Sequence, residues 1–330
     1  MKMKRIPRLD EDLSAVGFGC WGISGGDVWN NTTDADSIAA IHHALDRGIN
    51  VFDVAPVYGL GHAETILGQA LQGHRHAVII ASKCGLPWDD NNNVRVDLSA
   101  ASLCQEIDDS LRRLSTDYID IYQMHWPDPK TPIEESMEAL LRIQESGKIR
   151  HIGVSNFPAD LTRKALALGE IATYQGLYNL LERNPTSYHA IPLDYRMADE
   201  IVPLCREERI GLLPYSPLLQ GLLTDGFKAE GNFDENDVRS ENPKLSGEAF
   251  PTYFEMSEQL RAFARRIGKP LSQVAINWLI NQDVVASVIS GGQIPAHVEE
   301  NAGSASWDLT DAMLDEIETL LAPYKEAGLV

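Results

Sequence analysis

The sequence predicts an α/β protein whose eight parallel strands alternate with helices and close into a (β/α)8 TIM barrel, with a long loop after strand seven and an extra C-terminal helix. Short apolar, β-branched runs recur along the chain, as is typical of strands buried on both faces, and amphipathic segments separate them. A length of 330 residues is ordinary for one such barrel, so we expect residues 1–330 to form a single domain. On this pattern alone, an open doubly wound sheet is the alternative.

The expected elements follow one another in regular alternation. Strands are expected at AVGFG (15–19), NVFDV (50–54), AVIIASK (77–83), YIDIYQMH (118–125), IRHIGVS (149–155), ATYQG (172–176), IGLLPYS (210–216) and VVASVIS (284–290). The clearest helices are expected at residues 34–47, 98–114, 133–146 and 194–208. Thr32 and Thr33 precede the first helix, and Asp34 is its expected N-cap.

Two segments depart from this alternation. Residues 219–250 are polar, rich in Gly, Asp and Asn, and too long for a tight connection. This segment is either a lid over a bound ligand or a solvated loop without a role. Residues 309–321 have the pattern of an amphipathic helix beyond the eighth unit.

The composition argues against several kinds of partner. Lys and Arg total 28 against 48 Asp and Glu, a formal net charge of -20. Nucleic acids and anionic membranes bind basic faces, so we expect neither as a partner and interpret the charge as a solvated acidic surface. The cysteines, at positions 20, 84, 104 and 205, are widely spaced and are expected to be reduced thiols. The sequence shows no signal peptide and no membrane-spanning run, so we expect a cytoplasmic location.

Four polar residues lie at or just after strand ends: Asp53 and Tyr58 in FDVAPVYG, Lys83 in VIIASKCG and His125 in YIDIYQMHWPD. A parallel barrel presents such residues to a ligand at the carboxyl ends of its strands. Asp53 would hold Lys83 in place, and the lysine ammonium would lower the pKa of the Tyr58 phenol. His125 would hydrogen-bond a substrate oxygen. Each residue alone has an ordinary structural interpretation, but their joint placement indicates proton transfer to a carbonyl oxygen.

The spacing and context of these residues resemble those of the aldo-keto reductases, from GFGCWG near the start to VEENAG near the end. Further blocks match in order: GVSN (153–156), QGLYN (175–179), PYSPLLQGLL (214–223) and the glycine-containing segment after VASVIS. The resemblance decides for the closed barrel. It implies that Tyr58 is the proton donor of a tetrad with Asp53, Lys83 and His125. HWPD and QGLYNLLER look most like the bacterial branch that acts on sugars, inositol-linked metabolites and small aldehydes.

The same resemblance implies a nicotinamide dinucleotide as cofactor. Its expected contacts are Ser155, Asn156 and Gln175 for the carboxamide, Tyr215 for the ring face, Ser216, Leu218 and Gln220 for the pyrophosphate, Gly291, Gln293 and His297 after strand eight, and Glu300 and Asn301 for the adenine. Residues 17–22 also have the G-x-G-x-x-G pattern of a Rossmann site, but the turn-rich ISGGDVWNNTTD follows instead of a helix. We therefore expect the backbone at Gly19 and Cys20 to pass close to the nicotinamide, with Trp21 in the pocket wall.

The choice between NAD(H) and NADP(H) depends on the segment after strand eight. Related reductases generally carry Lys or Arg there to pair with the 2′-phosphate of NADP(H). Gln293 stands where the basic residue is expected, and no Lys or Arg occurs between Lys269 and Lys325. We therefore expect NAD(H) to bind at least as well as NADP(H), unless Lys228 or Arg239 in the long loop folds over the phosphate.

Three tryptophans follow strand ends near the tetrad and are candidates for the substrate pocket: Trp21, Trp88 and Trp126. Aromatic walls suit the apolar faces of a sugar ring or a hydrophobic aldehyde, although packing in the fold is an equal alternative. The polar loop at 89–93 favours a polyhydroxylated substrate. Tyr58 and His125 complete the expected substrate contacts.

These features predict an oxidoreductase that transfers a hydride between NAD(P)(H) and the carbonyl or alcohol carbon of an aldehyde or sugar-like small molecule, without metal or flavin. An NAD-dependent sugar 1-dehydrogenase is the leading alternative among enzymes. A cofactor-binding, redox-sensing regulatory subunit, like the channel-associated members of the family, is the alternative from another class. The sequence carries no signal for the oligomeric state or the direction of the reaction.

Overall fold

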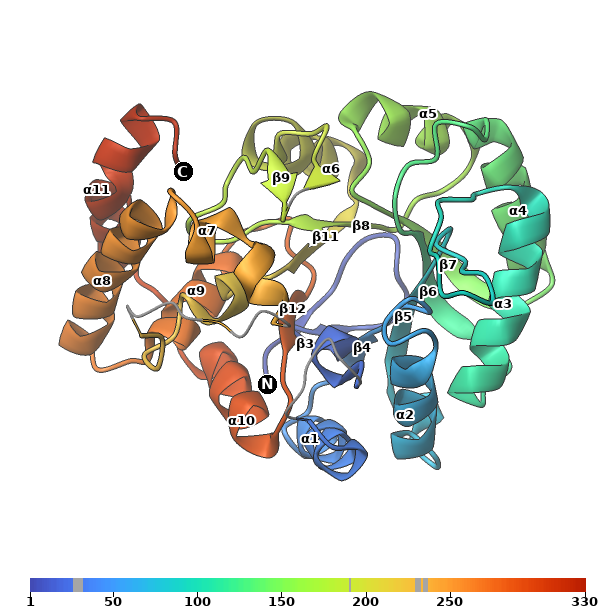
Figure 1. Ribbon diagram of the computed structural model, residues 1–330, viewed down its shortest axis with the longest axis horizontal. Coiled ribbons are helices and arrows are strands. Elements are labelled where there is room, and N and C mark those ends of the chain that lie inside the picture. The colour runs from blue at the N-terminus through green and yellow to red at the C-terminus, as the bar shows by residue number, and fades with distance from the viewer. Residues whose placement is uncertain (26–31, 190, 229–232, 234–236) are drawn as a thin grey trace.

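The computed structural model describes residues 1–25, 32–189, 191–228, 233 and 237–330. Its centre is one sheet of eight parallel strands in the order β11-β8-β7-β6-β5-β4-β3-β12 (Figure 1). The strands are β3 (Val16–Gly19), β4 (Val51–Asp53), β5 (Ile79–Cys84), β6 (Ile119–Met124), β7 (Ile149–Ser155), β8 (Thr173–Leu177), β11 (Gly211–Tyr215) and β12 (Val288–Gly291). Each overlaps one of the eight runs expected from the sequence.

The sheet closes on itself between β11 and β12. Leu212 in β11 bridges Val285, which lies just before β12. The Leu212 N–H donates to the Val284 carbonyl at 2.8 Å, and the Leu212 carbonyl accepts from the Ala286 N–H at 2.8 Å. This joint rests on one residue pair, whereas five pairs join β11 to β8 and four join β12 to β3. The expected TIM barrel is confirmed, and the open doubly wound sheet is excluded.

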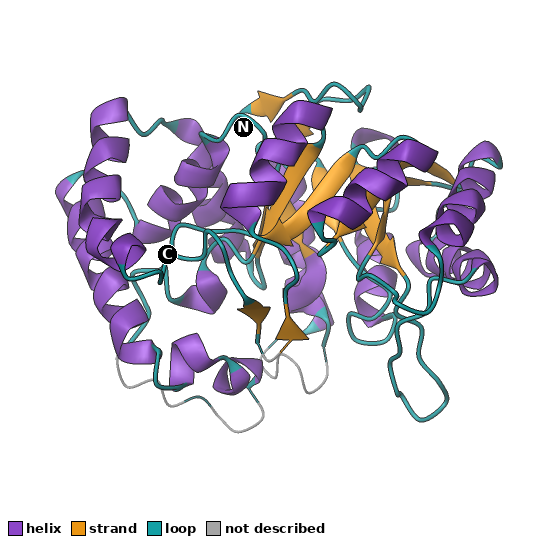
Figure 2. Cartoon of the chain, turned by 90° about the horizontal axis from the view of Figure 1, so that it is seen from above, coloured by secondary structure: helices purple, strands orange, loops and turns teal. Residues whose placement is uncertain are grey.

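Helices surround the barrel (Figure 2). They are α1 (Asp34–Asp46), α2 (His62–Ala70), α3 (Ala100–Leu114), α4 (Ile133–Glu145), α5 (Ala159–Leu168), α6 (Val202–Glu208), α7 (Pro243–Ser246), α8 (Phe250–Arg266), α9 (Leu271–Ile280), α10 (Pro295–Gly303) and α11 (Asp311–Glu326). The expected helix at 194–208 begins instead with a π-helical turn at Met197–Ile201 that continues into α6.

The expected N-cap of α1 is wrong by one residue. Thr33 has extended backbone angles, φ -92° and ψ 158°, and its hydroxyl accepts a hydrogen bond from the Asp36 N–H. Asp34 is instead the first helical residue, where its carboxylate still faces the positive end of the helix dipole. The carboxylate also lies 2.9 Å from Nε2 of His62.

Apolar side chains fill the barrel interior below the carboxyl ends of the strands. Val51, Ile79 and Ile121 from the strands form one cluster with Ile6 and Leu13 from the N-terminal segment. That segment carries the hairpin of β1 (Met3–Lys4) and β2 (Leu13–Ser14). Because Val51 and Ile79 begin their strands, the hairpin seals the amino end of the barrel and leaves the carboxyl end for a ligand.

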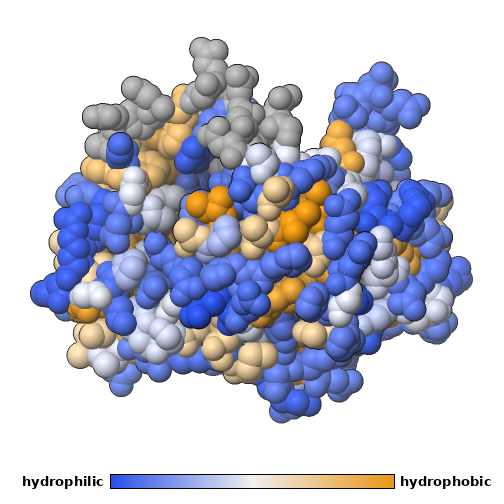
Figure 3. Space-filling view, turned by 90° about the horizontal axis from the view of Figure 1, so that it is seen from below, coloured by the Kyte–Doolittle hydropathy of each residue, from blue (hydrophilic) through white to orange (hydrophobic). Residues whose placement is uncertain are grey.

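The long segment at 219–250 contains the 3-10 turns η4 (Leu219–Gly221) and η5 (Val238–Glu241) and the short α7. Beyond it, α11 packs on α8 (Figure 1), and its Glu318 accepts a hydrogen bond from Arg183 at 2.9 Å. None of the helices in the described part of the chain is long and apolar enough to cross a membrane. On the face in Figure 3, hydrophilic residues predominate and hydrophobic ones show in small groups between them.

Candidate active site

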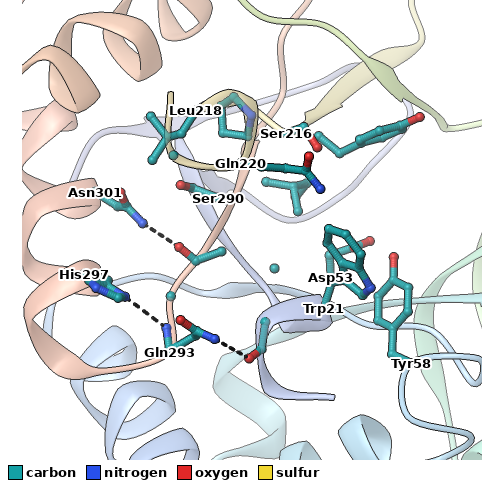
Figure 4. Close-up of a pocket in the computed structure, with 18 of the residues that line it drawn as sticks. Trp21, Asp53, Tyr58, Ser216, Leu218, Gln220, Ser290, Gln293, His297 and Asn301 are labelled. Carbon is teal, nitrogen blue, oxygen red and sulfur yellow. Dashed lines mark hydrogen bonds between the residues drawn. The ribbon is translucent and has the colours of Figure 1, made fainter. Parts of the chain in front are cut away.

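A cavity of about 630 Å³ opens at the carboxyl ends of the barrel strands (Figure 4). It extends from the ends of β3, β4 and β6 to β12 and the loop after β11. Its lining consists of Gly19, Trp21, Gly22, Asp53, Tyr58, His125, Trp126, Ser155, Asn156, Gln175, Tyr188, Tyr215, Ser216, Pro217, Leu218, Gln220, Gly221, Thr224, Asp225, Gly226, Arg239, Ile289, Ser290, Gly291, Gly292, Gln293, His297, Glu300 and Asn301.

A buried chain of hydrogen bonds stands behind the phenol of Tyr58. Nζ of Lys83 donates to Oδ1 of Asp53 at 2.7 Å and to the Tyr58 hydroxyl at 3.3 Å. It also donates to the Val54 carbonyl at 3.1 Å. Lys83 and Asp53 are 1% and 3% exposed, so their opposite charges compensate each other away from water. The second carboxylate oxygen of Asp53 accepts from Nε2 of Gln175 at 2.7 Å.

His125 lies beside Tyr58 on the same wall of the cavity. The centroids of the two rings are 6.1 Å apart, and the ring planes meet at 79°. The backbone N–H of His125 donates to the Cys84 carbonyl at 3.0 Å, and the backbone carbonyl of His125 accepts from Nδ2 of Asn156 at 3.2 Å. Oδ1 of Asn156 accepts from the Tyr215 hydroxyl at 2.9 Å. The polar residues at the carboxyl ends of β6, β7 and β11 thus hold one another in position.

Burial and charge set the protonation states of the two reactive rings. The pKa of Tyr58 lies well above its usual value, because desolvation and then the Asp53 carboxylate disfavour the phenolate. The pKa of His125 lies well below its usual value, because desolvation and then the Lys83 ammonium disfavour the imidazolium. The expected lowering of the Tyr58 pKa is not seen as a net effect, because burial of the phenol dominates. At neutral pH the site therefore holds a protonated phenol and a neutral imidazole.

The opposite end of the cavity is formed by β12, α10 and the loop after β11. Oγ of Ser290 is buried and has no hydrogen-bond partner among the described residues, so it can serve a ligand. Nδ2 of Asn301 donates to the Gly291 carbonyl at 2.9 Å (Figure 4). Nε2 of Gln293 donates to the Gly22 carbonyl at 3.4 Å, which joins this end to the turn after β3.

The charges at this end differ from residue to residue. Arg239 is the one Lys or Arg among the described residues that line the cavity, and its Nε donates to Asp237 at 2.9 Å. Glu300 also lines the cavity. Glu299 does not belong to the lining and pairs with Arg47 at 3.1 Å instead. No group of three or more His, Cys, Asp or Glu in the described part of the chain could hold a metal ion.

Most of the expected site residues meet at this one cavity, and three do not line it. Lys83 lies behind Tyr58. Cys20 opens the 3-10 turn η1 (Cys20–Ile23) with its side chain fully buried in the apolar core, so only its neighbours face the cavity. Trp88 bridges Val94 in the loop after β5, and the Arg113 guanidinium lies 5.6 Å from its ring.

The polar loop at 89–93 likewise lies outside the cavity lining. The Asp89 carboxylate accepts hydrogen bonds from the N–H groups of Asn91 and Asn93, both at 2.9 Å. The polar groups of this loop therefore satisfy one another at the surface and do not face a polyhydroxylated substrate in the cavity.

The glycine pattern at 17–22 lies in β3 and η1, as expected for a segment without a Rossmann helix. A Cβ at Gly17 would come within 2.9 Å of Oγ of Ser287, so this glycine is required by strand packing. Gly19 and Trp21 line the cavity, as expected. Sequence reasoning missed Tyr188 and Ser290, which carry no motif of their own; the only signal for Ser290 was its place at the end of the eighth strand.

Comparison with known proteins gives a consistent result. A model of the aldo/keto reductase family matches residues 15–322. Aldo-keto reductase YhdN of Bacillus subtilis is 36% identical over 324 residues, which cover 97% of this chain and 94% of that protein. The NADH-specific methylglyoxal reductase of Escherichia coli is 35% identical over 326 residues, covering 94% and 96%. The structure of the glycerol dehydrogenase AKR11B4 from Gluconobacter oxydans superposes with a TM-score of 0.86 at 35% identity, covering 97% and 95%.

Proposed function

This chain belongs to the aldo/keto reductase family of NAD(P)(H)-dependent oxidoreductases, and on that premise we propose that it reduces small aldehydes or sugar-like carbonyl compounds, with Tyr58 as the proton donor. One observation carries the proposal. The protonated Tyr58 hydroxyl lies on the cavity wall, 3.3 Å from the buried ammonium of Lys83 and beside the neutral ring of His125.

The far end of the cavity fits a nicotinamide dinucleotide. Ser290 offers a buried hydroxyl that lacks a partner among the described residues, and the glycines at 291 and 292 expose backbone to a ligand. Ser155, Asn156 and Gln175 would hold the carboxamide, and the residues from 216 to 220 and from 290 to 301 would hold the remainder. When bound, the reduced cofactor supplies a hydride to the carbonyl carbon.

The residues of the chain supply the proton and the polarisation. The Tyr58 hydroxyl and the His125 imidazole would both donate to the carbonyl oxygen, and Tyr58 would give up its proton as the alkoxide forms. Lys83 would then stabilise the resulting phenolate, and Asp53 would keep Lys83 charged and oriented. The raised pKa of Tyr58 keeps the phenol protonated at neutral pH, so a proton is available, and stabilisation of the phenolate by Lys83 would be needed for its transfer.

We propose further that NAD(H) is the preferred cofactor. Gln293 supplies no charge for a 2′-phosphate, and Arg239 is already engaged with Asp237. The methylglyoxal reductase at 35% identity is NADH-specific, which supports the same preference. Methylglyoxal and glycerol, named for two of the relatives, are small and uncharged, and this supports small aldehydes as substrates.

The decisive variant is Tyr58→Phe, assayed by the consumption of NADH with a panel of aldehydes and aldoses. Loss of one positioned proton donor should lower turnover by about 100- to 10,000-fold. Binding of NADH, followed by quenching of tryptophan fluorescence, should change little. Tyr178→Phe is the control, because Tyr178 is buried against Trp278 outside the cavity lining. Turnover by Tyr58→Phe close to that of the wild type would refute the assignment.

A further inference from the structure

Tyr188 lines the cavity, yet the chemistry above gives it no role. It lies in the short strand β9 (Ser187–Tyr188), which pairs with β10 (Ile191–Pro192) after β8. Its ring lies 6.4 Å from that of Trp21 and 5.3 Å from that of Tyr215. We call the part of the cavity lined by Trp21, Tyr58, His125, Trp126 and Tyr188 the substrate end.

Two loops hold Tyr188 in position. The ring of His189 packs edge-on against it at 4.6 Å. Nε2 of His189 lies 3.0 Å from Nε2 of Gln220, whose Oε1 accepts from Nδ2 of Asn242 at 2.8 Å. These contacts join the β9–β10 segment to the long loop after β11, so the phenol of Tyr188 is held in a fixed position before a ligand binds.

The substrate end offers only uncharged hydrogen-bonding groups. None of the five residues that define it is Lys, Arg, Asp or Glu, although Asp53 also lines the cavity. The nearest charges, those of Asp53 and Lys83, compensate each other at 2.7 Å. A carboxylate or phosphate on the substrate would therefore be buried there without a counter-charge, which is costly, whereas a hydroxyl or carbonyl oxygen would not.

The Tyr188 hydroxyl keeps a hydrogen bond for a ligand. Its pKa is raised by burial and by the nearby phenol of Tyr58, while a hydrogen bond with the Ser216 side chain acts in the opposite sense. Two hydroxyl groups carry two hydrogens, and a bond between them uses one. A hydrogen bond that lowers the pKa of a phenol is one that the phenol oxygen accepts, so Ser216 donates and the Tyr188 hydrogen is left for an acceptor in the cavity.

We propose that Tyr188 is a specificity-determining residue, which donates this hydrogen bond to a second, uncharged oxygen on the carbon next to the reacting carbonyl. The inference rests on the proposed function and narrows its substrates to α-hydroxy carbonyl and α-dicarbonyl compounds. In such molecules two oxygens sit on neighbouring carbons. Tyr58 and His125 would bind one of them, and Tyr188 would bind the other.

The test compares two aldehydes of nearly equal size, glycolaldehyde and propanal, which differ by a hydroxyl in place of a methyl group. In Tyr188→Phe the value of kcat/KM for glycolaldehyde should fall about fivefold, the size expected for one neutral hydrogen bond. The value for propanal should stay within about twofold, which also shows that the variant is folded. The control Tyr178→Phe should change neither value.

An equal fall for both aldehydes would show that Tyr188 only packs in the cavity wall, and no fall for either would show that it does not meet the substrate; both outcomes overturn the inference. A wild type that reduces other aldehydes but prefers propanal to glycolaldehyde would overturn it and leave the proposed function intact. A wild type that reduces no aldehyde at all would refute the proposed function itself, and this inference with it.

Discussion

Replacing Lys83 by methionine should destabilise the protein far more than the loss of one surface charge. Lys83 is 1% exposed, and it donates hydrogen bonds to Asp53, to the Val54 carbonyl and to Tyr58. Methionine keeps most of the volume but leaves Asp53 as an unpaired buried carboxylate with Gln175 as its remaining donor. Breaking a buried pair on one side costs about 3–5 kcal/mol, so this is the expected fall in the free energy of unfolding.

The double variant Lys83→Met with Asp53→Asn separates charge from packing. It removes both charges together, so the cost should shrink to about 1–2 kcal/mol for the hydrogen bonds that methionine cannot make. Urea unfolding followed by tryptophan fluorescence measures all three proteins. Lys148→Met is the matched control, because its exposed pair with Asp108 is worth at most about 1 kcal/mol.

Two results would refute this reasoning: a Lys83→Met protein within about 1 kcal/mol of the wild type, or a double variant less stable than the single one. The same variant bears on the chemistry. Any alcohol oxidation that remains in Lys83→Met should require a more alkaline pH, because the unpaired Asp53 carboxylate opposes formation of the Tyr58 phenolate. An unchanged pH profile would remove Lys83 from the proposed mechanism.

Two further predictions concern cofactor choice and pH. The wild type should have a dissociation constant for NADH no larger than that for NADPH. Gln293→Arg should tighten NADPH binding by about tenfold or more through a charged hydrogen bond, whereas the control Gln72→Arg, at an exposed position, should not. A wild type that binds NADPH about tenfold more tightly than NADH would contradict this. Burial raises the pKa of Glu106 from 4.5 to about 7. Its stabilising contribution is therefore complete below about pH 4.5, and as the pH rises through about 7 the free energy of unfolding falls by up to about 3 kcal/mol. Urea unfolding at several pH values should show this fall in the wild type and a flatter dependence in Glu106→Gln.

The strands could be predicted from local patterns in the sequence, whereas the closed barrel was chosen over an open sheet because of the resemblance to the aldo-keto reductases. Each strand is a short apolar run, and parallel strands bring their carboxyl ends to one side, so Asp53 and His125 had to meet once the order of strands was known. The lining of the cavity at Gly291 and Gln293 follows in the same way from the end of β12.

The features of the site that the sequence did not predict depend on local geometry that residue spacing does not encode. Cys20 and Trp21 are adjacent, and only the 3-10 turn after β3 decides that the thiol enters the core while the indole faces the cavity. Tyr188 reaches the cavity through a hairpin without apolar periodicity, held by contacts to a distant loop. The raised pKa of Tyr58 depends first on how deeply the phenol is buried and then on the nearby Asp53 carboxylate, neither of which a motif specifies.

Binding of the cofactor would also stabilise the joint between β11 and β12. The barrel closes there through Leu212 alone, and the residues proposed to hold the dinucleotide stand on both sides of that joint, with Ser216 following β11 and Ser290 within β12. A molecule bound to both strands would hold β11 and β12 together across the joint. By linkage, occupancy would then favour the closed ring over any state in which this joint opens. The cofactor would thus also stabilise the barrel where its strand pairing is shortest, between β11 and β12.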